Sequence, residues 1–111
     1  MNELIEKIFA NFDVPVSFLR YKGNASAYVT YSQTDIDNSL SGDDELLYYV
    51  EYYDFDIYSK GNYFSIIEGV KNILESNGFV WQPSRDSGDM YETETGYYHK
   101  TLCFAIERSN H

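Results

Sequence analysis

Apolar positions at the start of the chain recur with the period of an α-helix. They lie three or four residues apart, which places them on one helical face. The residues that share this face are Leu4, Ile5, Ile8, Phe9 and Phe12. Pro15 ends the pattern, because a proline pushes the residue before it out of the helical conformation. A longer apolar stripe of the same kind predicts a second helix from Asn62 to Asn77, with Gly78 as a left-handed stop.

The remaining apolar segments have the length and composition of β-strands. Val16–Tyr21 and Ala27–Tyr31 flank a Gly-Asn pair, which predicts a β-hairpin. Ser32–Asp44 is polar and predicts an exposed loop. Leu46–Ser59 is the longest strand, and two further strands follow the second helix, at Phe79–Gln82 and at about Tyr97–Glu107.

This succession of elements defines the expected fold class. The order α-β-β-β-α-β-β predicts an α+β protein with a mainly antiparallel sheet and two helices packed on one face. At 111 residues, the chain is expected to form a single domain that spans residues 1–111.

The long strand is unusual because its two halves follow different patterns. From Tyr53 onward apolar and polar residues alternate, as expected for a strand with one buried face. Leu46–Tyr53 instead is apolar or aromatic on both faces, so either another element or another chain must cover it. If another chain is the cover, this half is an interface with a second subunit or another protein. Its candidate residues are Leu47, Tyr48, Tyr49 and Tyr52.

Charge changes this picture through its placement more than through its total. The net charge is −10, which argues against sequence-specific nucleic-acid binding. No Lys or Arg occurs between Gly23 and Ser59, or within Asp86–Glu94, and these two stretches hold 12 of the 18 acids. The acids either keep a surface solvated or form an acidic face that mimics DNA or borders a path for DNA. Candidates for lining such a channel are Asp35, Asp37, Asp43 and Asp44.

Residues that could support catalysis or metal binding have simpler structural interpretations. Asp54 and Asp56 fit a metal-binding D-x-D pattern, but alternation on a strand with one wet face produces the same spacing. Glu92 and Glu94 are expected to be solvated loop acids. His99 is expected at the surface.

Cys103, the sole cysteine, lies in an apolar run and is expected to be a small buried hydrophobe that forms no disulfide. We therefore expect no catalysis, cofactor or metal. The acidic N-terminus and the lack of a long apolar run predict a cytoplasmic protein without a membrane span.

Four segments together resemble one family of bacteriophage proteins. They are Val14–Gly23, Tyr28–Tyr31, Tyr53–Tyr63 and Asp89–Lys100. These segments are similar to the tail terminator, or tail completion, proteins of long-tailed phages and prophages, which are also called tail-to-head joining proteins or minor tail proteins. The resemblance extends from about Val14 to Ile106.

The resemblance implies a structural role with no catalytic residues to carry over. Proteins of this family have an α+β fold of this element order and form a hexameric ring on the tail tube. The implied partners are copies of the chain itself, the major tail tube protein and the head-completion or connector protein. The implied location is the host cytoplasm during assembly and then the tail or neck of the virion.

Two other classes of function remain open at this stage. An acidic DNA-mimic inhibitor of a nuclease or restriction system would carry its acids along a continuous ridge. A carbohydrate-binding module would present two or three exposed aromatic rings in one plane.

Overall fold

The computed structural model describes residues 2–37, 41–42, 45–46 and 48–109. The helices are α1 (Asn2–Ile8), α2 (Phe64–Ser76) and the short 3-10 helix η1 (Pro83–Arg85). The strands are β1 (Val16–Phe18), β2 (Ala27–Asp37), β3 (Ser41–Gly42), β4 (Glu45–Leu46), β5 (Tyr48–Ser59), β6 (Val80–Trp81), β7 (Met90–Glu92) and β8 (Tyr97–Ser109).

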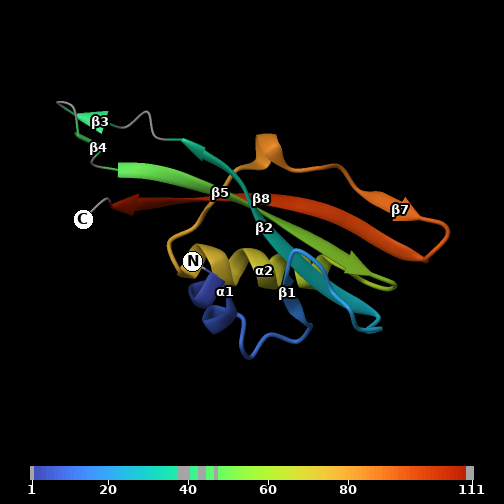
Figure 1. The fold of residues 1–111 in the computed structure, drawn as a ribbon. Coiled ribbons are helices and arrows are strands. Elements are labelled where there is room, and N and C mark those ends of the chain that lie inside the picture. The colour runs from blue at the N-terminus through green and yellow to red at the C-terminus, as the bar shows by residue number, and fades with distance from the viewer. Residues whose placement is uncertain (1, 38–40, 43–44, 47, 110–111) are drawn as a thin grey trace.

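One sheet organises the molecule, in the order β1-β2-β5-β8-β6, with β7 also paired to β8. All of its strand pairs are antiparallel except β1 with β2. α1 and α2 lie on one face of the sheet, while the segment that contains η1 crosses on the other side (Figure 1). We call these the helical face and the outer face. The predicted α+β class, with a mainly antiparallel sheet and two helices on one face, is confirmed.

The core forms where β5 faces the helices. Tyr53, Phe55 and Ile57 alternate along this strand and are at most 2% exposed, as the sequence pattern predicts. They pack against a cluster of buried residues from the helices and the neighbouring strands. Its other members are Ile5, Phe9, Val29, Tyr31, Tyr63, Ile67, Val70, Leu74, Phe79, Leu102 and Phe104.

The predicted β-hairpin between β1 and β2 is wrong, because these strands run parallel. Val16 lies opposite Val29, and Phe18 lies opposite Tyr31. The chain reverses directly after β1 at Leu19, whose φ is 65°. The N–H of Arg20 donates to the carbonyl of Phe18 at 2.7 Å, so Leu19 is the central residue of a γ-turn of the rare, strained kind.

Gly23 serves close packing in the returning loop rather than a hairpin turn. A Cβ atom on Gly23 would lie 2.0 Å from the hydroxyl oxygen of Tyr21, so only glycine lets the loop fold against this ring. The same hydroxyl accepts a hydrogen bond from the N–H of Ala25 at 3.3 Å. The Gly-Asn pair therefore lies in a tight loop, as its composition suggests, but the two strands that flank this loop are parallel.

The predicted exposed loop at Ser32–Asp44 is also wrong for its first part, because β2 continues to Asp37. Its partner is β5, with which it pairs as far as Val50, across an irregularity between Gln33 and Asp35. Backbone pairing stabilises this part of the strand without buried apolar side chains, so the mostly polar sequence did not indicate a strand. Asp43 and Asp44 lie outside the described residues.

The far ends of three strands form a projection that we call the arm. It comprises Gln33–Asp37 of β2, Tyr48–Tyr52 of β5 and Ala105–Ser109 of β8. In Figure 1 the ends of β5 and β8 continue beyond the two helices. The molecule measures 52 × 27 × 23 Å and has a radius of gyration of 15.2 Å, above the roughly 13 Å expected for a compact chain of this length. The elongation follows the sheet.

The γ-turn yields a prediction about backbone strain. Leu19→Gly is expected to leave the free energy of unfolding unchanged or to raise it by up to about 1 kcal/mol, because glycine adopts a positive φ without strain. The Leu19 side chain is 62% exposed, so little packing is lost. Urea unfolding of both variants measures the effect, with Gly78→Ala as the control. Gly78 has a φ of 89°, and its substitution is expected to cost about 1 kcal/mol. A Leu19→Gly loss as large as that of the control would contradict this account.

Candidate functional site

The residues predicted to form an interface differ in how far their own chain covers them. Tyr48 is 43% exposed at the start of β5, and Tyr49 is half-buried. Tyr52 is half-buried beneath Arg85, whose guanidinium carbon lies 3.9 Å from the ring centroid. One part of the two-faced strand is therefore covered by the η1 segment of the same chain. Leu47 lies outside the described residues, and the interface itself stays a prediction.

Two of the predicted channel acids lie beside β5, the strand that carries the predicted interface residues. Asp35 lies opposite Tyr52 on the outer face, and Asp37 lies opposite Val50. The carboxylate of Asp35 is 3.5 Å from the guanidinium of Arg85, which therefore contacts members of both predicted sets. Whether these acids face a channel stays a prediction.

The segment Gln82–Asp89 is not a strand, but it runs along the edge of β8 that faces away from β5. We call this segment the strap. Its backbone N–H groups at Gln82 and Ser87 donate to the carbonyls of Cys103 (2.8 Å) and Thr101 (3.0 Å). Its side chains accept the complementary bonds. The N–H of Cys103 donates to Asp86 at 2.8 Å, and the N–H of Thr101 donates to the hydroxyl of Ser87 at 2.8 Å. The strap thus supplies β8 with the hydrogen bonds of a missing strand.

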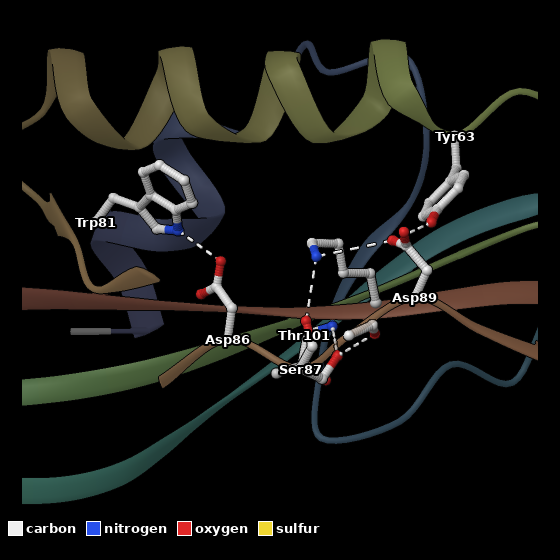
Figure 2. Close-up of polar contacts among 8 residues, drawn as sticks. Tyr63, Trp81, Asp86, Ser87, Asp89 and Thr101 are labelled. Carbon is white, nitrogen blue, oxygen red and sulfur yellow. Dashed lines mark hydrogen bonds and ion pairs between the residues drawn. The ribbon is translucent and has the colours of Figure 1, made fainter. Parts of the chain in front are cut away.

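The same strap is anchored to aromatic side chains that flank α2, as Figure 2 shows. The indole N–H of Trp81 donates to Asp86 at 2.8 Å, and the hydroxyl of Tyr63 donates to Asp89. Lys100 donates to the carbonyl of Ser87 at 3.1 Å and lies 3.7 Å from the carboxylate of Asp89. Two acids of the second base-free stretch therefore hold the strap in place.

The strap matters because an open sheet edge is a template for pairing with another chain. Along the edge of β8 that faces away from β5, β7 pairs with Tyr97–His99 and β6 pairs with Phe104 and Ala105. Between them, the strap bonds Thr101 and Cys103. In the part of the chain that the structure describes, this cover of β8 by strands and strap ends at Ala105.

The edge of β2 in the arm is protected in a different way. The strand is irregular between Gln33 and Asp35, and a bulge of this kind disfavours pairing with a further strand. The N–H of Ile36 is also occupied, because it donates to the carboxylate of Asp35 at 2.8 Å. Both long edges of the sheet thus carry features that oppose strand addition, which leaves side-chain surfaces as the better contact regions.

Asp54 and Asp56 are both engaged by groups of their own sheet. Asp56 accepts a hydrogen bond from the hydroxyl of Thr101 and lies 3.4 Å from the Nε2 of His99. Burial raises the pKa of Asp54, the neighbouring Asp56 raises it further, and a hydrogen bond with Cys103 lowers it. Among the described residues, no group of three or more His, Cys, Asp or Glu side chains could hold a metal ion.

His99 is not the surface residue that the sequence suggested. Its ring is half-buried and stacks on Tyr58 at a centroid distance of 4.2 Å. Tyr58 stacks on Tyr28, which stacks on Tyr21, so four rings form a row across the outer face. Alternation along β2, β5 and β8 places Tyr28, Tyr58 and His99 on one face, but it does not reveal that these rings stack or that Tyr21 joins them from a loop.

Cys103 is buried, as predicted, with 1% of its surface exposed. Burial, followed by the charge of Asp54, raises the pKa of its thiol to about 11. The thiol is therefore protonated at neutral pH.

Sequence reasoning missed an exposed aromatic group at the end of the sheet opposite the arm. We call it the end patch (Phe64, Tyr91 and Tyr98), and its members are 66%, 53% and 42% exposed. The rings of Phe64 and Tyr98 both pack against the buried Tyr63, at centroid distances of 5.1 and 5.9 Å. The ring of Tyr91 lies 4.8 Å from that of Tyr98. Beside them lies an open cavity of about 520 Å³ lined by Lys60, Gly61, Asn62, Tyr63, Phe64, Asp89 and Tyr98.

Comparisons with known proteins add no family assignment. No protein-family model matches the chain, and no curated protein sequence matches it. The resemblance to tail terminator proteins therefore stays a prediction from the residues quoted above. Within the described part of the chain, no helix combines the length and apolar character needed to cross a bilayer.

Two substitutions test separately the hydrogen bonds that Asp86 and Ser87 of the strap accept from the backbone of β8. Asp86→Ala is expected to lower the free energy of unfolding by about 2–4 kcal/mol, because two donors lose a charged acceptor. Ser87→Ala is expected to cost about 1 kcal/mol. Amide hydrogen exchange should accelerate at Cys103 in the first variant and at Thr101 in the second. Ser84→Ala, at an exposed strap position, is the control. Unchanged exchange at both amides would show that the strap does not protect this edge.

Proposed function

We propose that the chain is a structural, non-catalytic subunit that closes the tail tube of a long-tailed phage or prophage. In this role, copies of the chain form a ring on the last ring of the major tail tube protein. The opposite side of that ring presents a surface to the head-completion or connector protein. The role needs no cofactor, and it assigns the protein to the tail or neck of the virion after assembly in the host cytoplasm.

The observation that carries this proposal is the arm. Its strands extend beyond the helical layer and expose apolar side chains, with Ile36 50% and Tyr48 43% exposed. A monomer gains nothing from holding such side chains on a projection, whereas a subunit can bury them against a neighbour. Apart from the short strands β3, β4 and β7, the element order that the resemblance implies is also the order observed, which supports the same role.

The acids of the arm suit a protein that lets DNA pass without binding it. Asp35 and Asp37 belong to a stretch from Gly23 to Ser59 that contains no Lys or Arg. If this stretch faces the lumen of the ring, its charge repels the phosphates of passing DNA.

The DNA-mimic alternative has less support from the same residues. Asp35 lies beside Arg85, Asp54 is bonded with Cys103, and Asp56 accepts a hydrogen bond from Thr101. Carboxylates that are engaged by their own chain present a weaker row of charges to a basic enzyme. We therefore favour the structural role.

Tube capping tests the proposal directly. When the purified chain is added to polymerising tail tube protein, tubes are expected to stop growing and to carry a ring at one end, visible by electron microscopy. Tyr48→Glu is expected to weaken this capping about tenfold or more, because it charges an exposed apolar contact. Asn72→Glu, at an exposed position on α2, is the matched control. Tubes that grow unchanged and bind no protein would contradict the role, and tight binding to a basic nuclease would favour the DNA mimic instead.

Charge reversal tests the lining of the channel separately. Replacing Asp35, Asp37, Asp43 and Asp44 by Lys is expected to reduce DNA delivery by assembled particles about tenfold or more, because the new charges bind phosphate. The control reverses four other acids, Glu3, Asp13, Glu68 and Glu75, all of which are exposed. Particle assembly is counted by electron microscopy and delivery by infection or transduction. Equal delivery by both sets of particles would overturn the channel placement.

A further inference from the structure

One side chain of the strap reaches across the outer face of the sheet to the arm. Arg85 lies in η1, at the middle of the strap. Its guanidinium is 3.9 Å from the ring centroid of Tyr52 on β5 and 3.5 Å from the carboxylate of Asp35 on β2. Because the strap is docked on the far edge of β8, this one side chain connects that edge with two strands of the arm. We call Arg85, Tyr52 and Asp35 together the latch.

The backbone on both sides of Arg85 is bonded to β8. The next residue, Asp86, accepts hydrogen bonds from the N–H of Cys103 and from the indole N–H of Trp81, each at 2.8 Å (Figure 2 shows the second). The N–H of Arg85 donates to the carbonyl of Gln82 at 3.0 Å, and the N–H of Gln82 donates to the carbonyl of Cys103 at 2.8 Å. The position of the guanidinium therefore depends on a docked strap.

At its other end, the latch contacts the arm where β2 changes its course. One carboxylate oxygen of Asp35 accepts from the N–H of Ile36 at 2.8 Å, and the other faces Arg85. This residue directly follows the irregularity at which the register of β2 against β5 shifts. An irregularity of this kind bends a strand and increases its twist, so it sets the direction in which the strand continues. Arg85 is thus bonded to the residue at which the direction of the arm is set.

The strength of the latch is modest, and its charged groups can be reached from solvent. The side chains of Arg85 and Asp35 are 44% and 53% exposed, and with Thr34, Asp54 and Cys103 they line an open cavity of about 440 Å³. An exposed ion pair shifts a local equilibrium by a factor of about two to five. A cation over an aromatic ring contributes a similar factor. The two contacts together therefore favour the latched arrangement about tenfold.

We propose that the latch couples docking of the strap on β8 to the position of the arm. While the strap is docked, Arg85 holds the arm in one direction, so the arm loses less freedom when a partner binds it. By linkage, a partner that takes Asp35 or Tyr52 from Arg85 also weakens the docking of the strap. The latch does not rest on the proposed function, because all of its members belong to one chain.

Amide hydrogen exchange at both ends of the latch tests this coupling in the intact chain. Arg85→Ala removes both contacts and is expected to accelerate exchange about tenfold at the amides of Tyr48–Tyr52 and of Cys103. Arg85→Lys keeps the charge but loses the planar contact with the ring, so it is expected to accelerate exchange only about threefold. Ser84→Ala, at the neighbouring exposed position, is the matched control and should change neither probe.

A substitution in the arm tests the coupling from the opposite end. Asp35→Asn keeps an oxygen that accepts from the N–H of Ile36 but removes the charge that faces Arg85. It is expected to accelerate exchange at Cys103 about threefold, although β5 separates the two strands concerned. In a chain that already carries Arg85→Ala, it should have no further effect, because the coupling acts through that one side chain. Asp13→Asn removes an equal charge at an exposed position outside the strap and the arm, as the control.

Urea separates the latch from a general loss of stability. Local opening exposes little surface, so its exchange rate is insensitive to low concentrations of urea, whereas exchange through global unfolding is not. Acceleration of the insensitive exchange at both probes, with the Asp35→Asn effect lost beside Arg85→Ala, would support the latch. Unchanged exchange in the arm of Arg85→Ala, acceleration of the urea-sensitive exchange alone, or an Asp35→Asn effect that is equal with and without Arg85 would overturn it.

Discussion

The packing of one aromatic ring holds the layers of this molecule together. Phe55 is fully buried at the centre of β5. Its ring lies 5.9 Å from that of Tyr31 on β2, 6.0 Å from that of Phe104 on β8 and 6.1 Å from that of Phe9, just after α1. Burial of such a ring contributes about 1.5–3 kcal/mol, but its main effect is geometric. Because three strands and the first helix are fixed around one side chain, the strands can continue beyond the core as an arm.

That central packing leaves the edges of the sheet to be managed by other means. The backbone of β8 is hydrogen-bonded by the strap. At the edge of β2, Asp35 accepts from the N–H of Ile36, and the pairing with β5 is irregular. These devices are polar and local, so they cost no apolar surface. Their combined effect is selective, since they disfavour backbone pairing with other chains but leave the side chains at both ends of the sheet accessible.

The sequence predicts the parts of the fold in which one side chain pattern determines one structure. The alternation of Tyr53, Phe55 and Ile57 and the stripe along α2 were sufficient, since each has one buried face. The parallel β1–β2 pair could not be predicted from local patterns. It depends on a strained turn at Leu19 and on the parallel pairing of Val16–Phe18 with Val29–Tyr31. Similarly, Ser32–Asp37 is a strand because β5 lies beside it, which the polar residues themselves do not indicate.

The candidate site follows the same division. Alternation identifies the residues of β5 whose side chains point away from the core. It does not indicate that one of them, Tyr52, is covered by Arg85 from a distant segment of the chain. The end patch was missed for a similar reason. Its three rings come from α2, β7 and β8, and only the folded sheet brings them together.

The strap also gives the protein an internal optical reporter. Trp81 is the single tryptophan of the chain, and it sits where the strap begins. Its indole N–H is bonded to Asp86, and the ammonium of Lys71 lies 3.6 Å from its ring centroid. Intrinsic tryptophan emission therefore comes from one position whose polarity and hydrogen bonding depend on a docked strap. The state of this sheet edge can be followed in solution without a label.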